Sequence, residues 1–363
     1  MWCSHNGFQD LIQHVWSVPT VGNPIQIIIA KRKAVKQALK QWNKNIFGNI
    51  FTQIQSTVLD LNRSEATALD APSLAAKQDI QKLWDSFSCM ESYEEIFWKQ
   101  KSRAHWLEDG DRNTKFFHSI AAGNSKRSII HSIKRADGTT LSNIPDIKAE
   151  AIAHFQLLLQ EDDNPRFGDF LDPIPHKVIA QDNTFLMADP SYEELLEAVK
   201  AIPLDGATTP DEFTTAFFQS CWPIIRHDLL LVAKYFIGRA ALPRALMASL
   251  IYLIPKISAP ASFSDFHHIS LCNYLSMAES CILVQETFRD INKKVRGGNL
   301  LIKLYMEKAY DRLNWKSLRE VLKQFGFHNN WIFLVKRCWS ECWFSVLING
   351  EVADFFHSYR GLR

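Results

Sequence analysis

The chain has 363 residues, a hydrophobic fraction of 47% and a formal net charge of +2. This length allows two domains of ordinary size, and the apolar fraction is sufficient for a sizeable buried core. The small net charge excludes a strongly basic protein, so any surface for nucleic acid must be a local basic patch.

Cysteines and apolar runs narrow the class of protein further. The seven cysteines are scattered and odd in number, which does not fit a disulfide-rich secreted domain. Cys338 and Cys342 can share a helix face, but a structural zinc site needs four ligands and no nearby pair completes one. No apolar run reaches the ~20 residues that cross a bilayer, and no signal peptide is evident. We therefore expect a soluble intracellular protein with no membrane partner and no small-molecule cofactor.

The first half of the chain has the pattern of long helices. Pro24 can open a helix that runs through Ile46 and stops at Gly48. One face of this helix is basic and comprises Lys33, Lys36, Lys40 and Lys44. The opposite face is apolar and comprises Val35, Leu39, Trp42 and Ile46. A second long helix is predicted over residues 74–101.

The basic face of the first helix has two interpretations. Its lysines can follow a phosphate backbone, because bound Lys and Arg release condensed counterions. They can also form an ordinary solvated helix face. Trp42 lies on the other side, so we expect it in the core and not as a platform for base stacking.

Hairpin and helix signals alternate through the rest of the chain. Residues 128–141 predict a hairpin with its turn at Asp137-Gly138, and residues 344–348 followed by Asn349-Gly350 predict another. A capping box of Ser191 and Glu194 opens one helix. Further elements are expected at residues 223–239 (helix), 300–306 (buried strand) and Trp315–Phe325 (helix, stopped by Gly326). This mixture predicts an α+β protein with a helix-rich first half.

One apolar strand signal leads into a specific sequence motif. Residues 308–311 read Lys-Ala-Tyr-Asp, follow an apolar run and precede Trp315. This segment resembles the first catalytic motif of the reverse transcriptases of plant LINE-type (non-LTR) retrotransposons.

Several other segments resemble the same family, in the family's order. Residues 106–118 are similar to its linker between endonuclease and polymerase, and residues 2–16 to the end of the endonuclease. Residues 210–222, 253–256 and 265–273 look like the fingers, and residues 349–350 and 360–363 look like the next palm motif. The resemblance implies an endonuclease tail at 1–20, a helical linker region with a small hairpin at 21–165, and a partial right-hand polymerase with fingers and palm at 176–363. The proline-rich stretch 161–175 is the expected boundary.

The resemblance also implies roles for individual residues. Tyr305 stands where the family has its metal-binding Asp, and Asp311 where it has a supporting Asp. Lys256, His267 and Tyr310 stand at positions near the incoming nucleotide or the template. The linker motif contributes Arg112 and Lys115 as candidate nucleic-acid contacts. Each has a plainer alternative: a solvated turn for Lys256, a core position for Tyr310, and a helix-entry cap beside Asp109 and Asp111 for the linker pair.

This chain departs from the family at the residues that carry its chemistry. The family joins nucleotides with two Mg²⁺ ions, which prefer carboxylate oxygens. Tyr305 is an uncharged phenol at neutral pH. His267 stands where the family has an Arg in its fingers, and a histidine is largely neutral at that pH. His268 replaces a Pro, part of the fingers is missing after Asn273, and the sequence stops at Arg363 before the family's paired aspartates.

These departures lead to three hypotheses. The first is that the chain is by descent a reverse transcriptase (RNA-directed DNA polymerase), whose partner is an RNA or DNA template-primer. In this hypothesis the present copy has no intact metal site, binds no Mg²⁺ and is inactive. The second is a non-catalytic nucleic-acid-binding fragment, and the third is a product without function. The family resemblance places the protein in the cytoplasm or nucleus.

Overall fold

Contacts within the computed structural model divide the chain after residue 127, into units 1–127 and 128–363. The residues that the structure describes are 2–46, 48–102, 119, 122–123, 129–160, 171, 174–202, 204, 213–238, 243–272, 309–340 and 342–361. In this part of the chain no helix combines the length and apolarity that a bilayer crossing requires.

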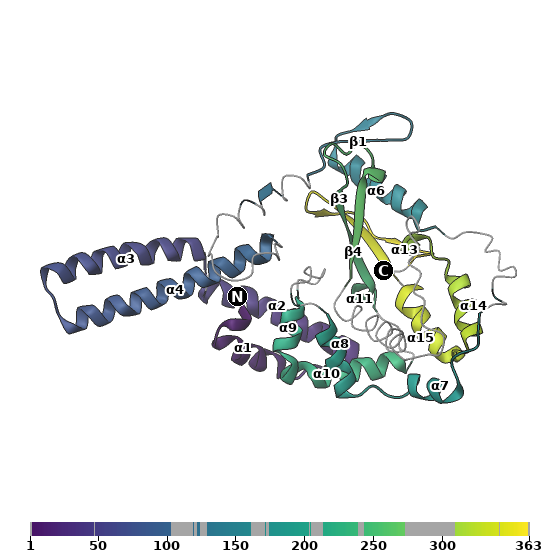
Figure 1. The fold of residues 1–363 in the computed structure, drawn as a ribbon, viewed down its shortest axis with the longest axis horizontal. Coiled ribbons are helices and arrows are strands. Elements are labelled where there is room, and N and C mark those ends of the chain that lie inside the picture. Colours follow the sequence, from purple (N-terminus) through teal and green to yellow (C-terminus); the bar gives the residue numbers. More distant parts are fainter. Residues whose placement is uncertain are drawn as a thin grey trace, which may run out of the picture. The chain divides into compact units, whose positions relative to one another are not determined.

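Helices make up the regular structure described in the first unit (Figure 1). They are η1 (Trp2–Ser4), α1 (Gly7–Trp16), α2 (Pro24–Ile46), α3 (Ile50–Asp70) and α4 (Leu74–Ser102). The sequence predictions of a helix from Pro24 through Ile46 and of another over residues 74–101 are confirmed.

Helices α1 and α2 pack through the apolar face that the sequence predicted for α2. Val35 and Leu39 are buried, and the Trp42 ring lies 5.1 Å from the ring of His5 and 6.3 Å from that of Phe8. Ile46, at the end of the same apolar face, is 43% exposed. The ten residues of α1 span about 15 Å against about 35 Å for the 23 residues of α2, so α1 cannot cover the end of α2.

Helices α3 and α4 lie side by side as an antiparallel pair (Figure 1). Positions in alternating steps of four and three residues, the spacing of a two-stranded coiled coil, are mostly buried or half-buried. On α3 they are Ile50, Ile54, Thr57, Leu61, Ser64 and Ala68; on α4 they are Ala76, Ile80, Leu83, Phe87, Met90, Glu94 and Phe97. The hydroxyl of Thr57 meets the sulfur of Met90 across this seam at 3.7 Å.

The second unit combines helices with a five-stranded sheet. Its helices are α6 (Ile144–Leu158), α7 (Ala180–Leu186), α8 (Tyr192–Ala201), α9 (Thr215–Ser220), α10 (Trp222–Ile237), α11 (Arg244–Met247), η2 (Phe263–Asp265), α13 (Ala309–Arg312), α14 (Trp315–Phe325) and α15 (Asn329–Ser340). Its strands are β1 (Ile133–Lys134), β2 (Thr140–Leu141), β3 (Ala248–Pro255), β4 (Phe266–Cys272), β5 (Trp343–Ile348), β6 (Glu351–Val352) and β7 (Phe356–His357).

The sheet joins segments that are far apart in the sequence. Its order is β4-β3-β5-β6, with β7 also paired to β5, while β1 and β2 form a separate hairpin. Strand β3 runs antiparallel to β4, with Leu253 opposite His268. It runs parallel to β5, with Ile251 opposite Val346.

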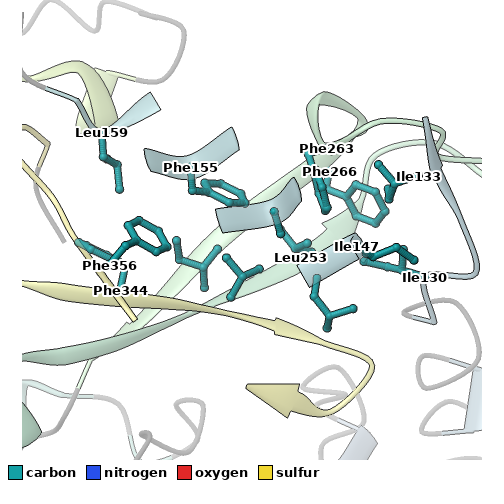
Figure 2. Packing of buried hydrophobic residues seen from close by; sticks show 14 of the residues in the cluster. Ile130, Ile133, Ile147, Phe155, Leu159, Leu253, Phe263, Phe266, Phe344 and Phe356 are labelled. Carbon is teal, nitrogen blue, oxygen red and sulfur yellow. The ribbon is translucent and has the colours of Figure 1, made fainter. Parts of the chain in front are cut away.

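One apolar cluster joins the hairpin, α6 and the sheet (Figure 2). Phe155 of α6 packs in the same cluster as Leu253 of β3 and Phe344 of β5. Ile133 of β1 and Ile147 of α6 complete one end of this cluster and are almost fully buried. The hairpin and α6 therefore belong with the sheet, whereas the division expected from the sequence placed them in a linker region ending at residue 165.

Local signals in the sequence correctly placed several elements of this unit. Ser191 and Glu194 form the reciprocal capping box of α8. Asn349 and Gly350 have φ of +51° and +87°, as a type I′ hairpin turn requires. Helix α14 has the predicted bounds and ends at Gly326 with φ +97°. The strand predicted at 300–306 lies outside the described residues.

Candidate functional site

The candidate site around the Lys-Ala-Tyr-Asp segment is described only in part. Asp311 lies in α13, and its side chain contacts His268. Tyr310 lies in the same short helix, but its side chain, like all of Tyr305, is outside the described part of the chain. Arg112 and Lys115 are also outside it. The assigned roles of these four residues therefore stay predictions.

Asp311 is paired with His268 of β4. His268 Nε2 lies 2.8 Å from Asp311 Oδ2, and the two side chains are only 18% and 19% exposed. His268 projects from β4 on the same face as the buried Phe266, and its ring meets the ring of Phe155 edge-on at 5.4 Å. The carboxylate is thus held by an imidazole against the apolar cluster.

A small cavity adjoins this pair. Its volume is about 10 Å³, roughly that needed for one water molecule and far below the volume of a nucleotide. Arg360 helps to line it and donates from Nε to the carbonyl of Leu158 at 2.8 Å. The carbonyl of Gly361 accepts from the indole of Trp315 at 2.6 Å. These contacts fasten the 360–361 segment beside Asp311.

His267 is exposed and lies on the opposite face of β4 from His268, because successive strand residues alternate. It is paired in register with Ile254. The ring of this candidate residue lies 6.4 Å from that of His268, but it is His268 that binds the Asp311 carboxylate.

Lys256 takes part in the turn between β3 and β4. Its Nζ donates to the carbonyl of Ser264 at 3.1 Å, and its backbone N–H donates to the carbonyl of Asp265 at 2.8 Å. It lies three residues beyond Leu253, the partner of His268, or about 10 Å along the strand. The observed contacts of Lys256 are those of the turn.

Asp265 organises the same turn. Its carboxylate accepts hydrogen bonds from the backbone N–H groups of Ser262 and Ala261 at 2.8 and 2.9 Å. These backbone bonds lower the pKa of Asp265 below its ordinary value, because they favour the ionised form.

The donors described near Asp311 do not by themselves fit a pair of Mg²⁺ ions. In the described residues no three His, Cys, Asp or Glu side chains are grouped so that they could hold a metal ion. The Asp311 carboxylate is bound by His268. A phenol such as that of Tyr305, six residues earlier in the sequence, is a poor ligand for a hard cation.

The basic face predicted on α2 is present. Lys33, Lys40 and Lys44 are exposed and Lys36 is half-buried. Arg32, by contrast, is 5% exposed, and burial lowers its pKa to about 10, so it remains charged at neutral pH. The four lysines of this face are called the α2 lysine face below.

A cleft where α2, α3 and α4 meet was missed from the sequence. Its volume is about 410 Å³. It is lined by Asn43, Gly48, Asn49, Ile50, Phe51, Glu94 and Phe97. The alternating spacing of four and three residues in α3 and α4 could have indicated that Ile50, Glu94 and Phe97 face one another.

Comparisons with known proteins give one informative match. No family model matches the chain. It is 22% identical over 369 aligned positions to a Xenopus laevis protein described as "Transposon TX1 uncharacterized 149 kDa protein". The alignment covers 91% of this chain and 28% of that protein, so the chain spans less than a third of the length of its relative. This similarity supports an origin of the chain from a transposable element.

Proposed function

We propose that this chain derives from the reverse transcriptase of a LINE-type retrotransposon and that this copy does not catalyse DNA synthesis. The descent is supported by the ordered motifs of the sequence and by the similarity to a transposon protein across 91% of the chain. The inactivity rests chiefly on one observation, the pairing of Asp311 with His268 at 2.8 Å.

That pairing matters because of what nucleotide addition requires. Two Mg²⁺ ions must hold the attacking and leaving oxygens, and carboxylates must hold the ions. Here a largely buried imidazole binds the Asp311 carboxylate, and the adjoining cavity has room for about one water. Tyr305 adds no charge at neutral pH.

A primer-extension assay tests this proposal. The full chain is incubated with a primed RNA template, deoxynucleotides and Mg²⁺, beside an active reverse transcriptase as positive control. We expect no extended primer from the unmodified chain. We also expect none from Tyr305→Asp, because His268 still holds Asp311 and the fingers position is still His267. Mg²⁺-dependent extension by either protein would overturn the proposal.

A second candidate function is sequence-independent binding of nucleic acid by the α2 lysine face. It is favoured by the exposure of Lys33, Lys40 and Lys44 on one side of a helix. Between residues 31 and 44 the sequence has six basic residues and no acid. Such a row of cations suits a phosphate backbone, and we expect a Kd of about 10⁻⁴–10⁻⁶ M that weakens with salt.

Charge reversal separates this function from simple solvation. Lys33→Glu/Lys40→Glu should weaken binding of a labelled RNA and make the salt dependence of the affinity shallower, because fewer counterions are released. The control is Lys77→Glu/Lys82→Glu, which makes the same change in net charge at exposed positions on α4. Equal loss of affinity in the two variants would show that only net charge matters and would exclude this surface.

A further inference from the structure

The cleft where α2, α3 and α4 meet has the size of a ligand site. Its volume of about 410 Å³ falls within the range of about 300–1,000 Å³ usual for small-molecule sites. The residues around it come from three segments: Asn43 lies in the last turn of α2, Asn49 caps α3, and Glu94 lies in the last third of α4. The cleft lies wholly within the first unit.

Aromatic rings form one side of the cleft. The ring of Phe51 lies 5.9 Å from that of Phe97 and 5.7 Å from that of Trp98. Phe51 is 37% exposed, so part of this aromatic group is open to a ligand. A nucleobase can stack on such rings, a contact worth about 1–3 kcal/mol per base.

Positive charge lies beside the aromatic group. The Lys101 ammonium is 4.7 Å from the ring centroid of Phe97 and 5.6 Å from that of Trp98. Lys99 is also in the last turn of α4, and Lys44 is in the last turn of α2. Cations at the ends of two helices that border the cleft suit the phosphates on either side of a bound base.

Glu94 is the charged side chain among the residues that line the cleft. It lines the cleft, and among the described residues no hydrogen-bond or ion-pair partner is found for its carboxylate. An ionised carboxylate only accepts hydrogen bonds. Guanine offers two adjacent donors, N1–H and the 2-amino group, on its Watson–Crick edge. Uracil offers one N–H between two carbonyl oxygens, which a carboxylate repels.

Two amides supply the complementary donors. Asn43 Oδ1 accepts from the indole of Trp2 at 2.8 Å, and Asn49 Oδ1 accepts from the backbone of Phe51 at 3.1 Å. These bonds use the amide oxygens and leave each NH₂ group as a donor at the cleft. A guanine O6 atom is an acceptor of the kind that these groups require.

We propose that this cleft receives an unstacked guanine base of a single-stranded nucleic acid, with Glu94 on the Watson–Crick edge and Phe51 against the ring. This inference rests on the proposed nucleic-acid-binding function and adds a base preference to it. Single-stranded RNA is commonly recognised in this manner, by stacking combined with hydrogen bonds to splayed-out bases.

Fluorescence anisotropy of the full chain with two labelled RNAs tests the preference. One RNA is a short run of adenines with a single central guanine, and the other has uracil at that position. We expect the guanine RNA to bind about tenfold more tightly, as a good two-bond contact to a base edge does. Glu94→Gln should reduce the preference to about twofold or less, whereas the neighbouring Glu95→Gln should retain it.

A second pair of variants tests the aromatic side. Phe51→Ala should weaken binding of both RNAs by about tenfold through lost stacking. Trp84→Ala, an exposed aromatic elsewhere on the α3–α4 pair, should leave both affinities unchanged. Circular dichroism checks that each variant keeps its helices.

The outcomes separate the two proposals. If neither RNA binds at low salt, the nucleic-acid-binding function fails and the cleft assignment fails with it. If both RNAs bind equally to the unmodified chain, the assignment of guanine to the cleft is wrong, while binding through the α2 lysine face stands. This comparison needs no variant, so misfolding of a variant cannot obscure it.

Discussion

The side-chain amide of Asn349 binds both backbone polar atoms of Ile130. Asn349 Oδ1 accepts from the Ile130 N–H at 2.7 Å, and Asn349 Nδ2 donates to the Ile130 carbonyl at 2.8 Å. The Asn349-Gly350 turn therefore does two things. It reverses the chain between β5 and β6, and it joins this hairpin to the segment before β1.

The substitution Asn349→Asp should destabilise the second unit. A carboxylate retains an acceptor for the Ile130 N–H but sets a second oxygen against the Ile130 carbonyl. Ile130 is only 5% exposed, so its carbonyl would lose its partner in a buried place. We expect a loss of about 1–3 kcal/mol in the free energy of unfolding, measured by urea denaturation. An Asn349→Asp variant as stable as the unmodified protein would contradict this account.

Gly326→Ala should be more harmful than Gly138→Ala. Both glycines have similar positive φ, +97° and +91°. A Cβ at Gly326 would lie 2.6 Å from the carbonyl oxygen of Val178, whereas one at Gly138 would meet nothing within 4 Å. Both changes strain the backbone, and only the first also forces a clash. The difference in unfolding free energy should exceed about 1 kcal/mol; equal losses would show that the α14–α15 turn shifts freely.

Asp311→Ala should lower stability by leaving His268 without its acceptor. With both side chains about four-fifths buried, the expected loss is about 1–3 kcal/mol. Asp311→Asn retains an acceptor oxygen and should lose less. Thermal unfolding of the two variants and of the unmodified chain measures this order of stability, with Asp311→Ala the least stable. If Asp311→Asn loses as much as Asp311→Ala, the hydrogen bond to His268 is not the source of the stabilisation.

Asp265 should make stability depend on pH in the acid range. Its pKa is lowered from 3.8 by the backbone N–H bonds of Ser262 and Ala261. A lowered carboxyl pKa stabilises the folded state above the unfolded pKa, and this contribution is lost as the pH falls through the folded pKa. The urea midpoint of Asp265→Asn should therefore lie below that of the unmodified chain at neutral pH, and the gap should narrow below pH 3.8. If the difference between the two urea midpoints stays constant across this pH range, the stabilising effect of Asp265 has a cause other than its ionisation.

The elements that the sequence predicted correctly depend on interactions between residues close together in the chain. The capping box of Ser191 and Glu194 and the stop at Gly326 depend on residues within one turn of each other. The Asn349-Gly350 turn follows from the positive φ that these two residue types tolerate. In each case the responsible interaction acts over a few residues, so a single sequence contains all the information.

Contacts between distant segments could not be read in the same way. Asn349 and Ile130 are 219 residues apart, and His268 and Asp311 are 43 apart. No periodic pattern links such residues. For the same reason the grouping of the β1–β2 hairpin with the sheet was not foreseen, because it depends on the cluster that Ile133 shares with Leu253 and Phe344.

In the candidate site, too, the sequence predicted local features but not the contacts between distant segments. The sequence identified Asp311 as a candidate site residue and Lys33, Lys36, Lys40 and Lys44 as one basic helix face. It did not show that His268 occupies the Asp311 carboxylate, which only the packing of α13 against β4 determines. The cleft beside Glu94 was missed although the spacing in α3 and α4 contained the signal.

The shared cluster of α6 and β5 also has a consequence during synthesis. About 190 residues separate Phe155 from Phe344 in the chain. At about 5–20 residues per second, the ribosome needs roughly 10–40 s to add them. Until β5 is made, the apolar face of α6 lacks part of its cover, and β3, once synthesised, presents the edge that will later pair with β5, a template for association with other chains. We therefore expect the nascent polypeptide to be most prone to association with other chains before β5 has emerged.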